Sequence, residues 1–387
     1  MKLFLKLTFA IIFFSITAVT SLSAAAYDSY IIKFKDIPTS QTIQSLTADY
    51  QISVSYPIKN IVNYTDNKSN KTLSSAQINL LRSLSAYRVI KFNNKDKSEQ
   101  FAAEMSSDQR IESIEPNYIF SINEGEETGP DPRQKDQWSL KAVNAERAWE
   151  KASGKGIVVG VIDTGIDSEH PDLVNSLWIN TKEDINGNGV FDPLDINGID
   201  DDGNGVIDDV RGYDFVDQSL VNIGDDDTRD PFPNDEHSHG TLVSGVIAAQ
   251  ADNAIGIKGL AYDSKIMPLR AFDATGNGES DDIAAAIIYA AMQGANVINM
   301  SFGEAHASSI VEDAVKFAYE SGCVLVASSG NNGWFYPHFP SDYDEVISVG
   351  ASNEINERFS RSNYGTNLDL IAPGVNILST YLNNQYR

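Results

Sequence analysis

The sequence predicts an α/β domain built on a parallel sheet, preceded by a small α+β domain. From about Asp131 onward, short and almost continuous apolar segments alternate with helical patterns, which is typical of a parallel sheet with helices on both faces. Before that point, residues 27–120 mix alternating strand patterns with helical ones, as antiparallel α+β domains do. Residues 121–132 are rich in Gly, Pro and Glu and are therefore expected to form an exposed linker.

Each expected element follows from its pattern of apolar residues. In the first domain we expect strands over 30–34, 52–56, 87–92 and 111–120, the last interrupted at Pro116, and helices over 41–50 and 98–105. In the second domain we expect strands over 157–162, 265–272, 297–300, 324–327 and 346–349, and helices over 239–250, 281–292 and 308–321. Because ligands bind at the carboxyl ends of strands in such sheets, catalytic residues are expected directly after them.

Composition limits the classes of partner. The 387 residues include 29 Lys and Arg against 54 Asp and Glu, a net charge of −25, which disfavours binding to nucleic acid or to an anionic membrane surface. A single cysteine, Cys323, excludes an internal disulfide framework and a cysteine-based metal cluster. Its apolar neighbours predict a buried thiol.

The N-terminus has the pattern of a signal peptide over residues 1–26. Lys2 and Lys6 precede an apolar stretch over 7–19, and small residues end at Ala26. The stretch is shorter than the roughly 20 residues of a membrane span, although an uncleaved anchor is the alternative. We therefore expect a secreted, extracellular protein without a stable membrane anchor.

Two strand ends carry candidates for acid–base chemistry. Asp163 follows an apolar strand and precedes a glycine turn, so it is either a half-buried orienting acid or a structural turn residue. His239 stands at the entrance of an apolar helix, next to Gly240, and is preferred over His237 as the catalytic histidine. The His-x-His spacing also raises the alternative of zinc, but no Glu-x-x-His pattern or third histidine follows nearby.

Two further strand ends offer polar backbone and side chains. One carries Ser301 to Gly303, and the other leads into the Gly-Asn-Asn-Gly segment that contains Asn331. An asparagine amide on a glycine-flanked loop can donate a hydrogen bond to a developing oxyanion. Taken alone, that segment is more typical of a turn.

Together, Asp163, His239, Ser301–Gly303 and Asn331 resemble, in order and context, the subtilisin-like serine proteases. Further segments resemble the family. Residues 168–173 resemble its segment after the catalytic Asp, and 253–261 resemble the loop after its catalytic-His helix. Residues 370–374 resemble its late Ala-Pro-Gly turn, and 114–118 resemble the end of its inhibitory propeptide. The resemblance covers nearly everything from residue 27 onward except the acidic insertion 183–236.

The resemblance implies a subtilisin-like catalytic domain over 133–387 and a ferredoxin-like propeptide domain over 27–120. It implies polypeptide substrates, with the protein's own propeptide as an intramolecular inhibitor. Asp163 would orient His239, the general base, and Asn331 would stabilise the oxyanion. The substrate-binding residues it implies are Ser301, Phe302, Gly303, Ser328, Ser329 and Gly330.

The family's nucleophile lies in a Gly-Thr-Ser motif after the Ala-Pro-Gly turn, and no Gly-Thr-Ser occurs in this sequence. We expect a chain truncated before the nucleophile and inactive in this form. The alternative is a calcium-dependent extracellular binding protein on a catalytically dead protease scaffold.

The acidic insertion 183–236 holds 17 acidic residues against Arg211 and Arg229, a charge of −15. Within it, 184–192 and 200–208 repeat the spacing of calcium loops, with oxygen ligands at alternate positions and a central glycine. The expected ligands are Asp184, Asn186, Asn188, the Val190 carbonyl, Asp192 and Asp195 in the first loop, and Asp200, Asp202, Asn204, the Val206 carbonyl and Asp208 in the second.

Position 12 of the second loop is Arg211, so its closing ligand is expected from Asp209, Asp201 or another loop. The alternative for both loops is a solvated acidic surface. The family resemblance implies one more calcium site, formed by Asp172, Asn253, Ile255 and Ile257.

Overall fold

The structure is a computed structural model that describes residues 29–47, 52–57, 74–92, 95–117, 119–122, 134–217 and 228–387. The predicted signal peptide and all but two residues of the predicted linker lie outside these ranges.

The strands are β1 (Ser29–Phe34), β2 (Ile52–Pro57), β3 (Tyr87–Phe92), β4 (Ile111–Pro116), β5 (Ile119–Ile122), β6 (Val158–Asp163), β7 (Tyr213–Asp214), β8 (Lys265–Arg270), β9 (Asn277–Glu279), β10 (Val297–Met300), β11 (Phe302–Gly303), β12 (Val324–Ser328), β13 (Val346–Ser352), β14 (Leu370–Pro373), β15 (Thr380–Tyr381) and β16 (Gln385–Tyr386). The α-helices are α1 (Ser40–Thr47), α2 (Ser75–Leu84), α3 (Lys95–Met105), α4 (Trp138–Ala142), α5 (Ala145–Trp149), α6 (His239–Ala248), α7 (Ser280–Met292) and α8 (Ser309–Glu320). Short 3-10 turns are η2 (Gln134–Asp136) and η3 (Val174–Ser176).

The N-terminal block, the described residues from Ser29 to Asn117, is an antiparallel sheet of order β2-β3-β1-β4 with helices α1 to α3. Its own core gathers apolar side chains such as Ile32, Ile90 and Phe101. The sequence prediction of two helices was wrong, because α2 was missed. That helix begins with a capping box, in which Ser74 and Gln77 bond each other's backbone N–H groups.

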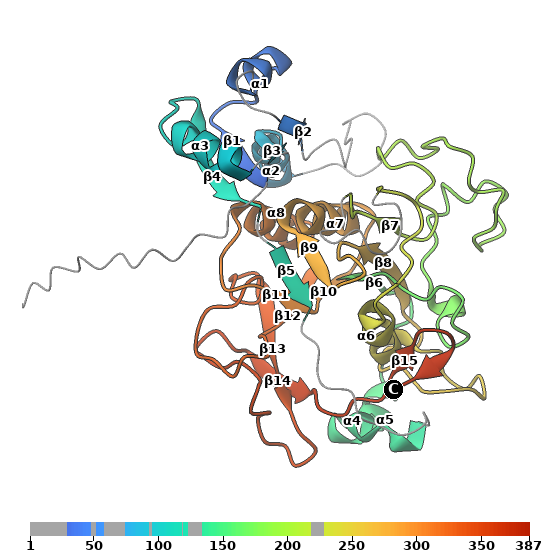
Figure 1. Ribbon diagram of the computed structural model, residues 1–387. Helices are drawn as coiled ribbons and strands as arrows, with labels where there is room; N and C mark the ends of the chain where they lie inside the picture. The colour runs from blue at the N-terminus through green and yellow to red at the C-terminus, as the bar shows by residue number, and fades with distance from the viewer. Residues whose placement is uncertain are drawn as a thin grey trace, which may run out of the picture.

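The rest of the molecule is built on seven strands of order β14-β13-β12-β10-β6-β8-β7, and every pairing within this sheet is parallel. Helices α7 and α8 pack on one face and α6 packs on the other (Figure 1). The prediction of an α/β parallel sheet covered on both faces is therefore confirmed. Strands β6 and β10 lie near the middle of this sheet, so the residues at their carboxyl ends sit above its centre.

The N-terminal block lies over α7 and α8 (Figure 1). The hydroxyl of Tyr87 donates to Asp313 at 2.9 Å, and the amide of Gln77 donates to the Ser321 hydroxyl at 2.9 Å. The carboxylate of Glu115 accepts the backbone N–H of Ser309 at the start of α8, at 3.1 Å, where an anion complements the helix dipole. The block is thus joined to the catalytic part by polar contacts from several of its elements.

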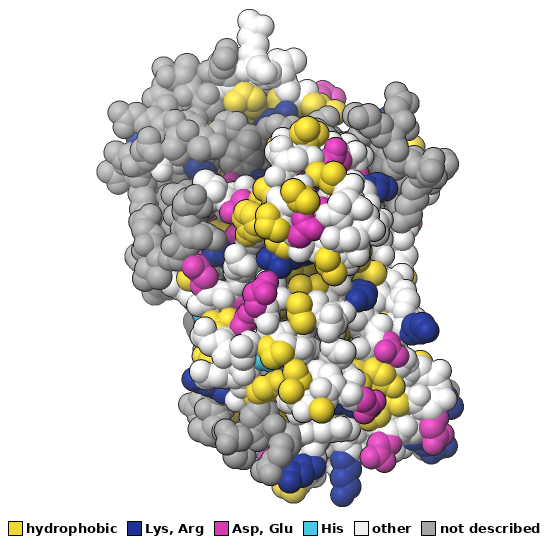
Figure 2. Space-filling view, turned by 90° about the vertical axis from the view of Figure 1, so that its right-hand side faces the viewer, with side chains coloured by type: hydrophobic (Ala, Val, Ile, Leu, Met, Phe, Trp, Pro, Cys, Tyr) yellow, Lys and Arg dark blue, Asp and Glu magenta, His cyan; other side chains and the backbone are white. Residues whose placement is uncertain are grey.

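The surface carries mixed charges. On the face shown in Figure 2, basic, acidic and apolar side chains are interspersed, and the Lys and Arg side chains lie singly or in small groups. Within the described ranges, no helix has the length and apolar character needed to cross a bilayer. Cys323 is buried in the core beside the seven-stranded sheet, as its apolar neighbours predict.

Candidate active site

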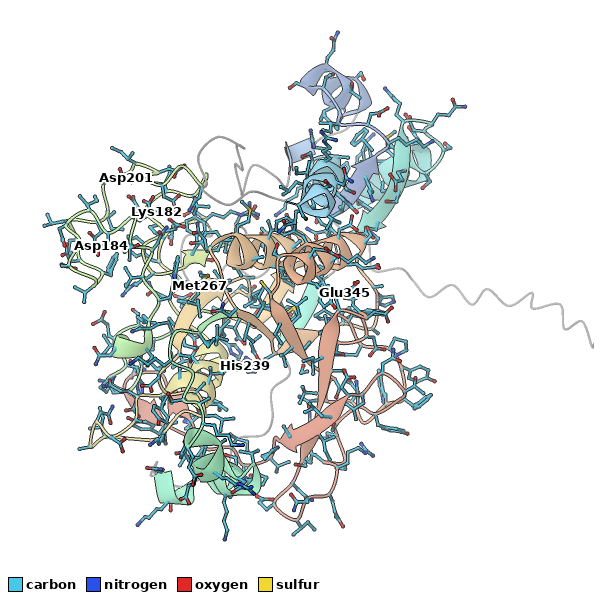
Figure 3. The ribbon with its side chains drawn as sticks, turned by 180° about the vertical axis from the view of Figure 1, so that it is seen from behind. Lys182, Asp184, Asp201, His239, Met267 and Glu345 are labelled. Atoms are coloured by element: carbon cyan, nitrogen blue, oxygen red, sulfur yellow. The ribbon has the colours of Figure 1, made fainter. Side chains whose placement is uncertain are left out.

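The two predicted acid–base residues meet at the centre of the sheet. Asp163 ends β6 and is fully buried, and both of its carboxylate oxygens contact Nδ1 of His239, at 2.8 and 2.9 Å. The backbone N–H of Thr164 donates to the same carboxylate at 2.8 Å. A proton on Nδ1 therefore faces Asp163, which leaves Nε2 as the basic nitrogen. His239 is the first residue of α6 and lies in the middle of the molecule in Figure 3.

A buried carboxylate that the sequence analysis missed shapes the entrance of α6. Asp235 accepts the backbone N–H groups of His237, Ser238 and Thr241 at 2.8 to 2.9 Å. It also accepts the hydroxyl of Thr164 at 2.9 Å. Ser238 has a left-handed backbone with φ of 97°, and these bonds hold that turn in place. Asp235 therefore fixes His239 through the backbone and not through its ring.

The zinc alternative has no ligand set among the described residues. Two groups of three potential metal-binding side chains occur there, both made of carboxylates, and neither includes His237 or His239.

The predicted substrate-binding strand pairs with a strand of the chain itself. Strand β5 lies between β9 and β11 and is antiparallel to both (Figure 1). Phe302 pairs with Ile122 and Gly303 with Ser121, while Phe120 pairs with Gly278. The space between β9 and β11 therefore binds an extended backbone on both edges. The linker was predicted to begin at Ser121, whereas the strand continues to Ile122.

Asn331 lines a cavity of about 510 Å³ beside this strand pairing, together with Asn277 and Gly303. The loop that carries Asn331 is organised by Asn363, another residue that the sequence analysis missed. The side-chain oxygen of Asn363 accepts the N–H groups of Asn332 and Trp334, each at 3.0 Å. Its backbone N–H donates to the Gly330 carbonyl at 2.9 Å, next to Ser328 and Ser329 of the predicted binding segment.

The ring of His338, which lines this cavity, packs against two glycines, Gly303 and Gly330. A Cβ on Gly303 would lie 2.0 Å from that ring, and one on Gly330 would lie 2.8 Å from it, so neither position has room for a side chain. Nδ1 of His338 lies 3.1 Å from the Ser328 carbonyl. Burial lowers the pKa of His338, which keeps the ring neutral at the base of the cavity.

Comparison with known proteins identifies the family of this chain. The model of the subtilase family, Peptidase_S8, matches residues 154–387. The chain belongs to the subtilase family. Its relatives include the thermophilic serine proteinase of Bacillus sp. (strain AK1), 36% identical over 303 residues that cover 78% of this chain and 64% of that protein. Thermitase of Thermoactinomyces vulgaris is 32% identical over 250 residues, covering 65% of this chain and 74% of thermitase.

A solved subtilase-like structure supports the same fold. A protease from Pseudoalteromonas arctica superposes with a TM-score of 0.54 and 28% identity, covering 67% of this chain and 78% of that one. The chain thus spans only part of the length of several relatives, including the proteinase of strain AK1.

In this subtilase, the first acidic repeat folds around Asp184. The carboxylate of Asp184 accepts the N–H of Gly189 at 2.7 Å, and the amides of Asn186 and Asn188 both donate to Asp192, at 2.7 and 2.9 Å. Val190 follows on the same turn, and Asp195 closes it by accepting the N–H groups of Ile185 and Asp192. The predicted side-chain ligands of this loop are therefore linked by hydrogen bonds, but the two asparagines turn their amide nitrogens, not their oxygens, toward Asp192. In Figure 3, Asp184 lies at the edge of the molecule, well separated from His239.

The second repeat gathers a carboxylate from outside its own loop. One oxygen each from Glu183, Asp200 and Asp202 lie within 4.8 Å of one another. Glu183 is fully buried, and one of its oxygens has no hydrogen-bond partner within the described part of the chain. Its other oxygen accepts the N–H of Asp202 at 2.7 Å. An unpartnered buried carboxylate oxygen beside two more carboxylates fits a hard cation with oxygen ligands.

Asp209, not Asp208, lies beside this group, and the amide of Asn180 donates to both Asp202 and Asp209. The amide of Asn204 donates to Asp209 at 2.8 Å, and the hydroxyl of Tyr289 in α7 also donates to it. The carboxylate of Asp208 points to a different turn, where it accepts the N–H groups of Asn197 and Gly198. The assignment of Asp208 as a ligand is therefore not supported, while Val206 lies on the loop as expected, with its N–H bonded to Asn204.

These carboxyls titrate unusually. Burial, reinforced by nearby Asp202, raises the pKa of Glu183 to about 7. Burial likewise raises the pKa of Asp209 to about 8. Burial therefore disfavours the ionised form of both carboxyls.

The third predicted site is a hydrogen-bonded cluster around Asp172. The buried carboxylate of Asp172 accepts the amide of Asn253 at 2.6 Å and the N–H of Ile257 at 3.0 Å. The hydroxyl of Tyr386 donates to it at 2.9 Å. Ile255 lies on the same loop with its side chain exposed. The predicted residues meet, but Ile257 presents its N–H and not its carbonyl to Asp172.

Proposed function

We propose that this protein is a secreted serine endopeptidase precursor that hydrolyses peptide bonds of polypeptides. The observation that carries the proposal is the two-oxygen contact of Asp163 with His239, beside a cleft whose two edge strands pair with an extended chain. Relatives named as serine proteinases support the same reaction class. The signal peptide pattern of residues 1–26 supports export.

His239, Asp163 and Asn331 would each have a separate role in peptide hydrolysis. His239 Nε2 takes the proton of a serine hydroxyl as that hydroxyl attacks the peptide carbonyl, and later passes it to the leaving amine. Asp163 holds the ring in the required tautomer and stabilises its cationic form. The amide of Asn331 donates to the oxyanion from its glycine-flanked loop. The substrate backbone would replace β5 between β9 and β11.

The N-terminal block would act as an inhibitory propeptide. Strand β5 occupies the position that a substrate strand would need, so the cleft is blocked while the block is attached. Cleavage between about Phe120 and Asp131 would release it. N-terminal sequencing of the processed protein tests this, and a mature end before Ile111 or well after Trp138 would count against it.

Calcium would bind in the acidic insertion. Glu183, Asp200 and Asp202, with Asp209 beside them, would hold one ion, and the carboxylates of the Asp184 loop would hold another. A bound divalent cation would supply the positive charge that these carboxylates lack.

The coding sequence after Arg387 tests the proposed activity. A continuing reading frame with Gly-Thr-Ser, whose product cleaves casein and is blocked by a serine-directed inhibitor, is the expected result. A stop codon directly after Arg387, with calcium binding but no peptidase activity, would favour a binding protein on an inactive protease scaffold.

A further inference from the structure

A second acidic pocket lies where the N-terminal block meets the start of α7. One oxygen each from Asp217, Asp281 and Asp282 lie within 4.8 Å of one another, and Glu279 at the end of β9 is next to them. Asp281 and Asp282 are 0% and 2% exposed, and Glu279 is 6% exposed. We call these four carboxylates the α7 acidic pocket. All four belong to the catalytic part of the chain.

A lysine of the N-terminal block enters this pocket. Nζ of Lys91, on β3, lies 2.8 Å from Asp217 and 3.0 Å from Glu279, and Lys91 is 6% exposed. The amide of Asn117, from the same block, donates to Glu279 at 3.0 Å and to Asp281 at 2.7 Å. A lysine is rarely buried to this degree unless it is paired.

The catalytic part supplies one cation of its own. Arg229 lies 2.6 Å from Asp282 and 3.1 Å from Asp217. With Lys91, the six named groups sum to −2 when all are ionised, since four carboxylates face two cations. Without Lys91, the same groups would sum to −3 in a site that excludes most water.

The titration of these groups agrees with that balance. Burial raises the pKa of Asp282, and Asp281 and Asp217 raise it further. Burial also raises the pKa of Glu279, against the opposing effect of Lys91. Burial alone would lower the pKa of Lys91, but Glu279, Asp281 and Asp217 outweigh it and raise that pKa. The pocket therefore favours a bound cation.

We propose that the α7 acidic pocket is a lysine-binding site through which the catalytic domain recognises its N-terminal block, with Lys91 as the residue recognised. The inference rests on the proposed role of the block as a propeptide, because only then does docking regulate the enzyme. It adds a contact that is separate from the strand pairing of β5, since Lys91 comes from β3 and reaches side chains and not the cleft backbone.

The test compares Lys91→Met with Lys33→Met in the full chain, in saturating calcium. Lys33 is a matched control because it also reaches across the interface, lying 3.5 Å from Asp313, but in a more exposed pair. At pH 8 we expect the melting temperature to fall by on the order of 10 °C for Lys91→Met and by about 1–2 °C for Lys33→Met.

The pH dependence separates lost charge from lost packing. Without Lys91, the pocket carboxyls have pKa values still further above those of the unfolded chain, so their stability contribution is lost as pH rises through the folded pKa. The Lys91→Met deficit should therefore be large at pH 8 and much smaller at pH 5. A packing defect would give the same deficit at both pH values and would overturn the proposal.

A reciprocal variant keeps the proposal falsifiable if Lys91→Met folds poorly. Glu279→Gln removes one negative charge, so Lys91→Met/Glu279→Gln should regain at least half of the lost melting temperature at pH 8. Strictly additive losses would contradict direct recognition. None of these measurements uses peptidase activity, so a lack of peptidase activity would contradict the proposed function alone, while the melting temperatures test the contact of Lys91 with the pocket.

Discussion

Two regions of the molecule hold buried carboxylates in different ways. Asp163 ends a central strand and contacts His239 and the N–H of Thr164, all within the chain. Glu183 and Asp209 lie in an insertion made largely of turns, and one oxygen of Glu183 has no partner within the described residues. The first arrangement is complete as the chain folds. The second leaves a buried carboxylate oxygen that the proposed cation would complete.

The difference shows that the sheet fixes the positions of Asp163 and His239, whereas the charges of the insertion are not balanced by the fold. A parallel sheet fixes the positions of its strand ends relative to each other, so Asp163 and His239 stay in contact without a bound ligand. Turns that wrap around side-chain oxygens have few apolar contacts to hold them, and their carboxylates repel one another.

The largest expected effect is the loss of kcat when His239, which contacts Asp163 at the end of β6, is replaced. In a gene product that carries the serine, His239→Ala should lower kcat by roughly 10⁶-fold, a magnitude carried over from subtilisin. Calcium-dependent stability should be unchanged, which thermal unfolding with and without chelator would show. Purified residues 27–387, which contain no Gly-Thr-Ser, should turn over no faster than their own His239→Ala variant. Clear turnover that depends on His239 would contradict the expected inactivity.

The next effect concerns Asn331. In the same gene product, Asn331→Ala should lower kcat by roughly 10²–10³-fold with little change in KM, the loss known from the matching asparagine of subtilisin. The reason is that its amide acts on charge that develops only in the transition state. Asn332→Ala is the control, because that residue contributes its backbone N–H to Asn363 and should keep most of its activity.

Calcium removal should act on the insertion alone. At about 100 times the dissociation constant, each ion adds roughly 2.7 kcal/mol to the free energy of unfolding, so chelator should lower the melting temperature. Asp184→Ala together with Asp200→Ala should remove part of that calcium response while the Asp163–His239 contact persists. Equal melting temperatures in chelator and in millimolar calcium would mean that the loops are solvated acidic surface.

The smallest effect is a pH trend without calcium. The folded pKa values of Glu183 and Asp209, about 7 and about 8, lie above those of the unfolded chain. Their stabilising contribution is therefore present at low pH and lost as pH rises from about 5 to 8. Melting temperatures in chelator should fall across this window, and Glu183→Gln should flatten the fall. A melting temperature that rises with pH in chelator would contradict it.

The sequence predicted the sheet better than the contacts between distant segments. Strand 297–300 was predicted with the bounds that the structure shows, because the apolar residues Val297, Ile298 and Met300 mark it. Helix α2 was missed although its capping box was present in the sequence. Glu183 was missed because its partners lie 17 and 19 positions further along the chain, and only the fold brings them together.

The candidate site divides in the same way. Asp163 and His239 follow strand-end and helix-entrance patterns that single segments carry. Asn363 and His338 act on loops remote from them in sequence, so no local pattern assigned their roles. Asp208, which has a left-handed backbone with φ of 57°, bonds the N–H groups of Asn197 and Gly198 instead of joining the carboxylates of its loop, and the ligand spacing did not predict this.

Strand β5 is part of the same chain as the cleft that it is proposed to block, and this attachment sets its local concentration there. A tethered strand competes with substrate at an effective concentration in the millimolar range. Once the backbone after Ile122 is cut, the same strand competes only at the concentration of the free protein. The proposed inhibition would then weaken as the enzyme and its cleaved block are diluted. Dilution into a large extracellular volume would therefore activate the enzyme.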